Sequence, residues 1–174
     1  MNTVYFLYYP AWPDKTEQAL GTVFPELNDD DSGTLSAFLF TEVDGMIYTD
    51  IKTCLENVLN HVTEDESYTG NAYHLQMDAE FTSIFDLYAY EDDDDYDDSD
   101  EDDDWDVEDL DDEDDDFENA RELKLVLEIN SSQLLRAMMD YRQKKDDFAK
   151  GWRPDIVVEA DPNEITTEMV MSKI

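Results

Sequence analysis

The chain has 174 residues, 41% hydrophobic and 12% aromatic, and a formal net charge of −37. This apolar content excludes a wholly disordered protein, and the length suits one domain with a buried core. Binding to nucleic acid or anionic lipid requires Lys and Arg to displace counterions, so the charge excludes a nucleic-acid binder and a membrane-surface protein. It favours basic proteins and divalent cations as partners.

Cys54 is the only cysteine, which rules out an intramolecular disulfide and predicts a reducing, cytoplasmic location. The opening residues MNTVYFLYYPAWPDK contain no basic segment and only a short apolar run. We therefore expect neither a signal peptide nor a membrane span.

The first half of the chain predicts strands, one turn and one helix. Residues 3–9 (TVYFLYY) predict a buried strand, and residues 14–20 at most a short helix. Residues 34–50 have the order apolar, Asp44-Gly45, apolar, which predicts a hairpin.

An amphipathic helix is predicted over residues 49–62, because its apolar residues follow the i, i+3, i+4, i+7 spacing. Thr49 or Asp50 would cap this helix. The polar residues 64–71 predict a loop. Alternating apolar residues predict strands over 72–78 and 81–91.

After the acidic residues, 121–129 (RELKLVLEI) alternate with the period of a strand. Residues 131–150 predict a second amphipathic helix, capped by Ser131 or Ser132 and ending at Gly151. Residues 155–161 predict a last short strand, with a polar tail after it. The sequence thus predicts one α+β domain over residues 1–174: a mostly antiparallel sheet, two amphipathic helices, and a long acidic insertion, 91–118, between two strands.

The acidic insertion holds 22 acids and no base in 28 residues, whereas residues 119–174 hold ten acids and nine bases. A block of like charge is often only a solvating segment. This one is tethered at both ends to predicted strands, and its few other residues include Tyr96, Trp105 and Phe117. Alternation of acids and rings is typical of segments that clamp a basic partner, because carboxylates pair with Lys and Arg while rings stack on guanidinium groups.

The charge spacing of the insertion resembles that of a nucleic acid strand. Extended at about 3.3 Å per residue, it carries about one acid per 4 Å, against one phosphate per about 3.4 Å of a single strand. A helix would place the acids about 2 Å apart, nearer the duplex value of about 1.7 Å, but self-repulsion opposes it. We expect the extended form, with Trp105 as the main anchor. The candidate partner-binding residues are Asp95, Tyr96, Asp97, Asp102, Asp103, Asp104, Trp105, Asp106, Glu108, Asp109, Asp114, Asp115 and Phe117.

Two other uses of these acids remain open. The insertion could fold back onto the basic second helix and its exit, which carry Arg136, Arg142, Lys144, Lys145, Lys150 and Arg153. It could also bind divalent cations weakly and without specificity. Asn28, Asp30, Ser32 and Gly33 follow a partial calcium-loop order, but the twelfth position is Leu39 instead of Glu. We therefore expect no specific metal site and no cofactor.

The sequence carries no catalytic signature. Cys54 and His61 are seven residues apart on one predicted helix, without a third residue to orient a base. No glycine-rich phosphate loop is present, since the five glycines are scattered. We therefore expect no enzymatic activity, and a helix-terminal role for His61.

Residues 123–148 (LKLVLEINSSQLLRAMMDYRQKKDDF), a strand, a polar pair and a helix that opens on Leu-Leu, resemble bacterial immunity proteins that neutralise nuclease toxins of interbacterial competition systems. The small acidic α+β domain fits the same family. Because nuclease toxins have basic clefts, the resemblance implies an acidic inhibitor. The alternatives are a phage-type nucleic-acid mimic against a host defence protein, an acidic chaperone for histone-like or ribosomal basic proteins, and a calcium buffer.

Overall fold

The computed structural model describes residues 4–9, 19–90, 123–158 and 166–172. They form seven strands and four helices: β1 (Tyr5–Tyr9), β2 (Ala19–Val23), α1 (Asp29–Glu42), α2 (Gly45–Leu59), β3 (Asp65–Thr69), β4 (Tyr73–Asp78), β5 (Phe81–Tyr90), β6 (Leu123–Asn130), α3 (Ser131–Ala149), β7 (Ile156–Val157) and α4 (Thr167–Met171).

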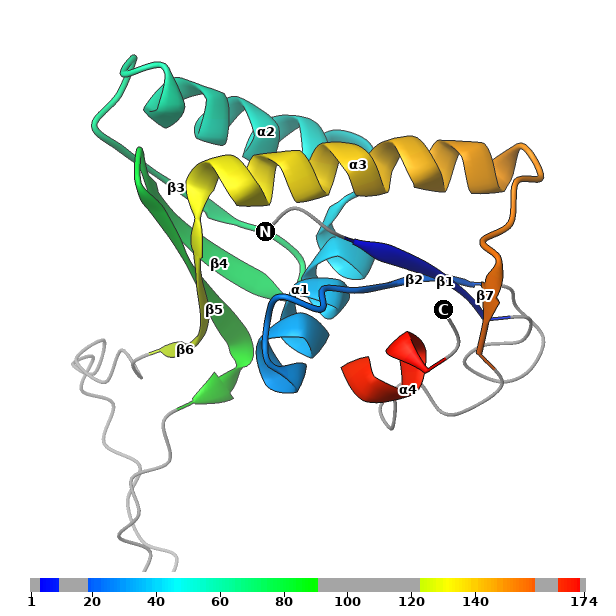
Figure 1. Cartoon of the computed structure of the whole chain (residues 1–174). Helices are drawn as coiled ribbons and strands as arrows, with labels where there is room; N and C mark the ends of the chain where they lie inside the picture. Colours follow the sequence, from blue (N-terminus) through cyan, green and yellow to red (C-terminus); the bar gives the residue numbers. More distant parts are fainter. Residues whose placement is uncertain (1–3, 10–18, 91–122, 159–165, 173–174) are drawn as a thin grey trace, which may run out of the picture.

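The strands make two sheets (Figure 1). Four strands pair antiparallel in the order β3-β4-β5-β6. The smaller sheet has the order β2-β1-β7, in which β7 pairs with β1 in parallel. The predicted α+β class with a mostly antiparallel sheet is confirmed, although the described residues hold four helices where two were predicted.

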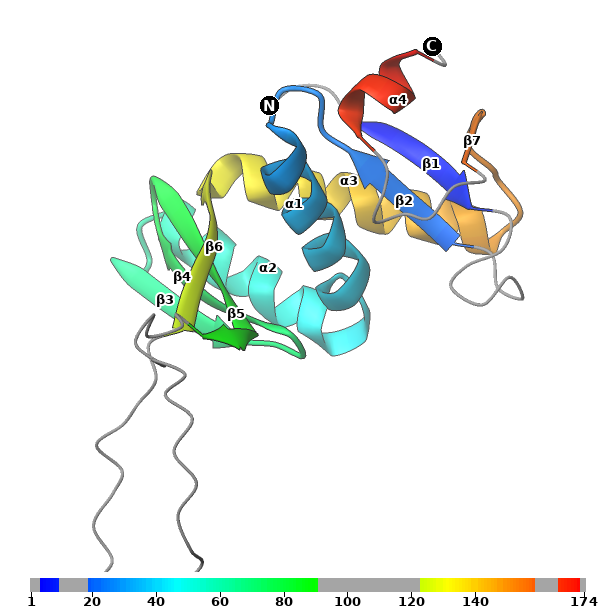
Figure 2. The same ribbon diagram turned by 90° about the horizontal axis from the view of Figure 1, so that it is seen from below.

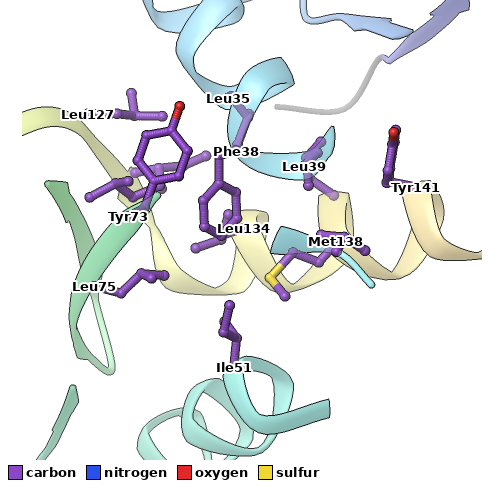
Figure 3. Packing of buried hydrophobic residues seen from close by; sticks show 14 of the residues in the cluster. Leu35, Phe38, Leu39, Ile51, Tyr73, Leu75, Leu127, Leu134, Met138 and Tyr141 are labelled. Atoms are coloured by element: carbon purple, nitrogen blue, oxygen red, sulfur yellow. The ribbon is translucent and has the colours of Figure 1, made fainter. Parts of the chain in front are cut away.

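Helices α1, α2 and α3 cover one face of the four-stranded sheet, as the two perpendicular views show (Figures 1 and 2). The main core lies between them. Phe38, Ile51, Leu75, Leu134 and Met138 meet there with no exposed surface (Figure 3). Each such side chain stabilises the fold by about 1.5–3 kcal/mol relative to its exposed state. The core therefore depends on all three helices at once.

The predicted hairpin over residues 34–50 is wrong, because this segment holds the end of α1 and the start of α2. The Asp44 side chain accepts a hydrogen bond from the Gly45 N–H at 2.8 Å and caps α2. Asp44-Gly45 is thus a helix start instead of a turn. The predicted caps Thr49 and Asp50 lie inside α2.

Several other predicted boundaries also differ. The polar residues 65–69, predicted as loop, form the edge strand β3, and part of the polar tail forms α4. Asn130 caps α3 in place of Ser131 or Ser132. The Ser131 hydroxyl instead donates to the Asp78 carbonyl at 2.7 Å, which joins the start of α3 to the turn between β4 and β5. Of the predicted short helix, residues 14–18 lie outside the described residues, and 19–20 belong to β2.

A buried carboxylate holds the turn between β3 and β4. Glu42, at the end of α1, has no exposed surface, and its two oxygens accept the N–H groups of Asn71 at 3.0 Å and Ala72 at 2.7 Å. A Cβ atom on Gly70 would lie 2.3 Å from the carboxylate. The Glu42 carboxylate therefore joins the end of α1 to the turn between β3 and β4.

Strand β2 forms an edge of the smaller sheet, and side chains of α1 and α3 bond its outer backbone groups. The Tyr141 hydroxyl donates to the Leu20 carbonyl at 3.2 Å, and the Ser36 hydroxyl donates to the Thr22 carbonyl at 2.6 Å. The Ser32 hydroxyl accepts the N–H of Phe24 at 3.0 Å. These groups belong to alternate residues, so they point to the same side of the strand. Hydroxyl groups of α1 and α3 thus satisfy the hydrogen bonds of backbone groups along the β2 edge.

Helices α2 and α3 both end in a Schellman motif. After α2, Val62 N–H bonds the Asn57 carbonyl at 2.8 Å and His61 takes the left-handed position at φ +55°. After α3, Gly151 takes that position at φ +104°. A residue with a Cβ atom is disfavoured there, whereas glycine is not.

We therefore expect His61→Gly to raise the free energy of unfolding by about 0.5–1 kcal/mol, because glycine relieves the left-handed conformation. Gly151→Ala, as the matched change at the end of α3, should lower it by about 1 kcal/mol. Urea unfolding followed by circular dichroism measures both. Equal destabilisation by the two changes would contradict the prediction.

Candidate functional site

All of the predicted partner-binding residues, Asp95 to Phe117, lie outside the described residues. The structure does describe where the segment that contains them joins the body. Strand β5 ends at Tyr90 and β6 begins at Leu123, and these two residues are register partners in an antiparallel pair. Residues 91–122 therefore leave and re-enter the body at adjacent points of one sheet.

The face of the four-stranded sheet opposite the helices is uncovered by any described helix or strand (Figures 1 and 2). We call it the open face. Alternation along the strands and the pairing register assign residues to it. They are Asp65, Ser67 and Thr69 of β3, His74, Gln76 and Asp78 of β4, Phe81, Ser83 and Phe85 of β5, and Leu125, Glu128 and Asn130 of β6.

One row of the open face lies close to the ends of residues 91–122. His74 and Leu125 are both register partners of Phe85, and Thr69 is the partner of His74. The His74 and Phe85 ring centroids are 6.0 Å apart, and the Thr69 hydroxyl lies 2.8 Å from His74 Nδ1. Leu125 is 47% exposed. We call Thr69, His74, Phe85 and Leu125 the apolar row, after its two apolar members Phe85 and Leu125. Sequence alternation could have suggested these positions, but not that their face is uncovered.

Apart from Phe81, which is 41% exposed, the remainder of the open face is polar and acidic. It carries the carboxylates of Asp65, Asp78 and Glu128, and none of its residues is Lys or Arg. The backbone N–H groups of Phe81 and Glu80 hold the pKa of Asp78 below its ordinary value. Asp78 therefore stays charged at neutral pH, and the open face has the same sign of charge as the acidic insertion.

Most of the cations that the acidic insertion could have reached contact groups of the body. Arg142 and Lys145 both pair with Asp44, at 3.0 and 3.2 Å. Lys144 Nζ lies 4.5 Å from the Trp152 ring centroid, and Arg153 lies 4.0 Å from that of Phe148. These contacts join α3 to α2 and to its own exit loop.

The ion pairs of Asp44 lead to a prediction about pH. Hydrogen bonds and charge from Lys145, then Arg142 and the Gly45 N–H, lower the pKa of Asp44. Because its pKa is lowered in the folded state, the ionised Asp44 stabilises the fold at pH values above the unfolded-state pKa of about 3.9. This stabilisation is lost as the pH falls through the folded-state pKa. Asp44→Asn keeps the cap but not the charge, so it should lower the free energy of unfolding at pH 7 by less than about 1 kcal/mol, since the pair is exposed. The difference should vanish near pH 2 in urea titrations; a difference that persists there would contradict this cause.

Residues that could support catalysis have ordinary structural surroundings. Burial, followed by the charges of Glu66 and Asp50, raises the pKa of the Cys54 thiol, whereas a nucleophilic thiol needs a lowered one. His61 is exposed after the end of α2. Among the described residues, no group of three or more His, Cys, Asp or Glu side chains is arranged to hold a metal ion. The partial calcium loop is the first turn of α1, with Asn28 as its cap.

A hollow of about 710 Å³ lies between β2, α1 and α4. Its described lining is formed by hydroxyl and apolar side chains together with Asp29 and Asp30, and contains no His, Cys, Lys or Arg. The Asp29 carboxylate already accepts the Thr167 N–H at 2.9 Å. Nothing in this lining converges on one ligand, so the open face is the better candidate site.

The fold and the site define an α+β protein with an acidic, partly apolar sheet face. Comparison with protein-family models, with curated proteins and with solved structures gives no match. No helix in the described part of the chain is long and apolar enough to cross a membrane.

Proposed function

We propose that the chain is a non-enzymatic, cytoplasmic inhibitor that occupies a basic nucleic-acid-binding surface of another protein, in the first place a nuclease toxin. The observation that carries this proposal is the placing of 22 acids in residues 91–118, between β5 and β6. Carboxylates at nearly the spacing of phosphates can pair with the same Lys and Arg groups that bind a nucleic acid strand.

Two features of the body support the proposal. The open face carries the carboxylates of Asp65, Asp78 and Glu128 and neither Lys nor Arg, so it has the same sign of charge as the acidic insertion. Tethering both ends of the segment at adjacent residues lowers the entropy lost on binding relative to a free tail.

The proposal is tested with the full chain and with a variant in which a Gly-Ser segment of equal length replaces residues 91–118. Both are immobilised, and proteins captured from the source cells are eluted and purified. We expect the intact chain alone to capture a basic protein, and to displace a labelled single-stranded oligonucleotide from it at equimolar amounts.

Retention of the same protein at the same affinity by the Gly-Ser variant would show that the body carries the binding and would refute the mimic. Weakening by salt is expected for every electrostatic interaction, so it does not separate this proposal from an acidic chaperone. Displacement of the oligonucleotide does separate the two. A toxin gene directly upstream would independently favour an immunity protein over a phage-type mimic.

A further inference from the structure

Phe85 and Leu125 form an apolar cross-strand pair on the open face, with Leu125 two residues after the start of β6. Neither side chain belongs to the two clusters that form the core or to the residues packed against them. Single exposed apolar side chains are ordinary on any surface. Here, however, the two lie opposite each other in register, and the His74 ring extends the row on the neighbouring strand.

The surroundings of the apolar row indicate what kind of surface fits it. Glu128 lies in the next row of the open face, opposite Ser83, and Asp65 and Asp78 lie one row further along the strands. On the other side of the apolar row, residues 91–122, which hold the acidic insertion, join the sheet at Tyr90 and Leu123. A matching surface must therefore present cations around a small apolar or aromatic centre. Clefts that bind single-stranded nucleic acid have this composition, since they combine a positive groove with aromatic side chains on which bases stack.

We propose that the apolar row is a second contact for the same partner: it binds aromatic or apolar side chains that border the partner's basic cleft, while residues 91–118 bind the cations. This inference rests on the proposed function and narrows the partner to a protein with a single-strand-binding type of cleft. The apolar row supplies a contact that salt does not screen. A polyanion alone cannot distinguish one basic protein from another, so this contact supplies selectivity.

A second copy of the chain is a poor occupant of the open face. Pairing two open faces would bring together two surfaces that each carry the carboxylates of Asp65, Asp78 and Glu128. Each copy also adds the 22 acids of its residues 91–118 to the repulsion. Like charges that face each other oppose association, and no Lys or Arg on the open face offsets them.

The test uses two synthetic peptides of equal length and equal charge, one of Arg with Gly spacers and one of Arg with Leu spacers. We expect the Leu peptide to bind the full chain at least about tenfold more tightly, because its Leu side chains bury apolar surface on the row. Phe85→Ser combined with Leu125→Ser should abolish this advantage. The control is Met139→Ser on α3, which removes a side chain of the same 47% exposure and should leave the advantage intact.

Titration of the Leu peptide into the unsubstituted chain provides a measurement that does not depend on the stability of a variant. The backbone amide signals of Ser83, Phe85 and Leu125 should shift in NMR spectra, whereas those of α3 should not. Absence of these shifts, an advantage that survives the double substitution, or equal affinity of the two peptides for the full chain would each overturn the inference. If both peptides instead bind equally well after Gly-Ser replacement of 91–118, the proposed function itself fails.

Discussion

Glu42→Gln is expected to lower the free energy of unfolding by about 2–4 kcal/mol, the largest effect on stability that we predict for a single substitution. The carboxylate is fully buried and accepts one backbone N–H on each oxygen. Glutamine has the same size but only one acceptor, so its NH₂ group must face the N–H of Asn71 or Ala72. Hydrogen bonds to a charged group contribute about 1.5–3 kcal/mol, and the buried N–H that remains without a partner adds a desolvation penalty.

Glu56→Gln is the matched control, since the Glu56 side chain is 44% exposed and its ion pair within the described residues is with Lys52, one turn away on α2. It should change stability by less than about 0.5 kcal/mol. Gly70→Ala tests the same site from the opposite side, because its Cβ atom would meet the Glu42 carboxylate. Thermal and urea unfolding at pH 7 measure all three. A Glu42→Gln protein as stable as the Glu56→Gln protein would mean that the carboxylate does not hold the turn.

The second large effect concerns affinity. Tyr96→Ser, Trp105→Ser and Phe117→Ser together leave the charge of the chain unchanged. If these rings stack on guanidinium groups, the intact chain should bind polyarginine more tightly than polylysine of equal length. Three cation–π contacts of about 0.5–1 kcal/mol each correspond to a preference of about 10- to 100-fold, which the triple substitution should remove. Isothermal titration calorimetry with both polymers measures it.

Val107→Ser with Leu110→Ser is the control for the rings, since it removes apolar side chains of the same segment without an aromatic ring. The preference for polyarginine should persist in this variant. A simple polyanion or a calcium buffer would respond to neither set of substitutions. If the triple substitution leaves the preference unchanged, the rings are not contacts, and the acids alone account for the binding.

The parts of the fold that the sequence predicted well are those whose apolar pattern is unbroken. Strands β4, β5 and β6 alternate cleanly, and α2 has a continuous apolar stripe. Helix α1 was missed because its buried positions Leu35, Phe38, Leu39 and Glu42 include a carboxylate, which hid a helical i, i+3, i+4, i+7 spacing. Strand β3 was missed for a related reason. It is an edge strand in which Tyr68 is the only apolar residue, because the other inward position holds Glu66, so it lacks the apolar alternation of a half-buried strand.

The candidate site also has one part that the sequence predicted and one part that it did not. The acidic insertion is visible in the sequence, because a block of charge requires no knowledge of the fold. The apolar row is not visible. Leu125 alternates in the sequence with the buried Leu127 and Ile129 and would be assigned to the core, whereas a register shift in the pairing of β5 with β6 turns it to the open face. Phe85 alternates with Ile84, and either one could be the core residue. Which set faces solvent depends on where α1, α2 and α3 pack, and that is decided by tertiary contacts.

The hydroxyl bonds along the edge of β2 affect what happens after the chain meets a cationic partner. Free in solution, molecules with a charge of −37 repel one another and remain dispersed. A neutralising partner removes this repulsion, and an open strand edge would then be a site for aggregation. Ser32, Ser36 and Tyr141 bond that edge without any ionised group. This protection therefore remains in a complex whose charge has been cancelled, which is the state in which an acidic inhibitor would have to persist.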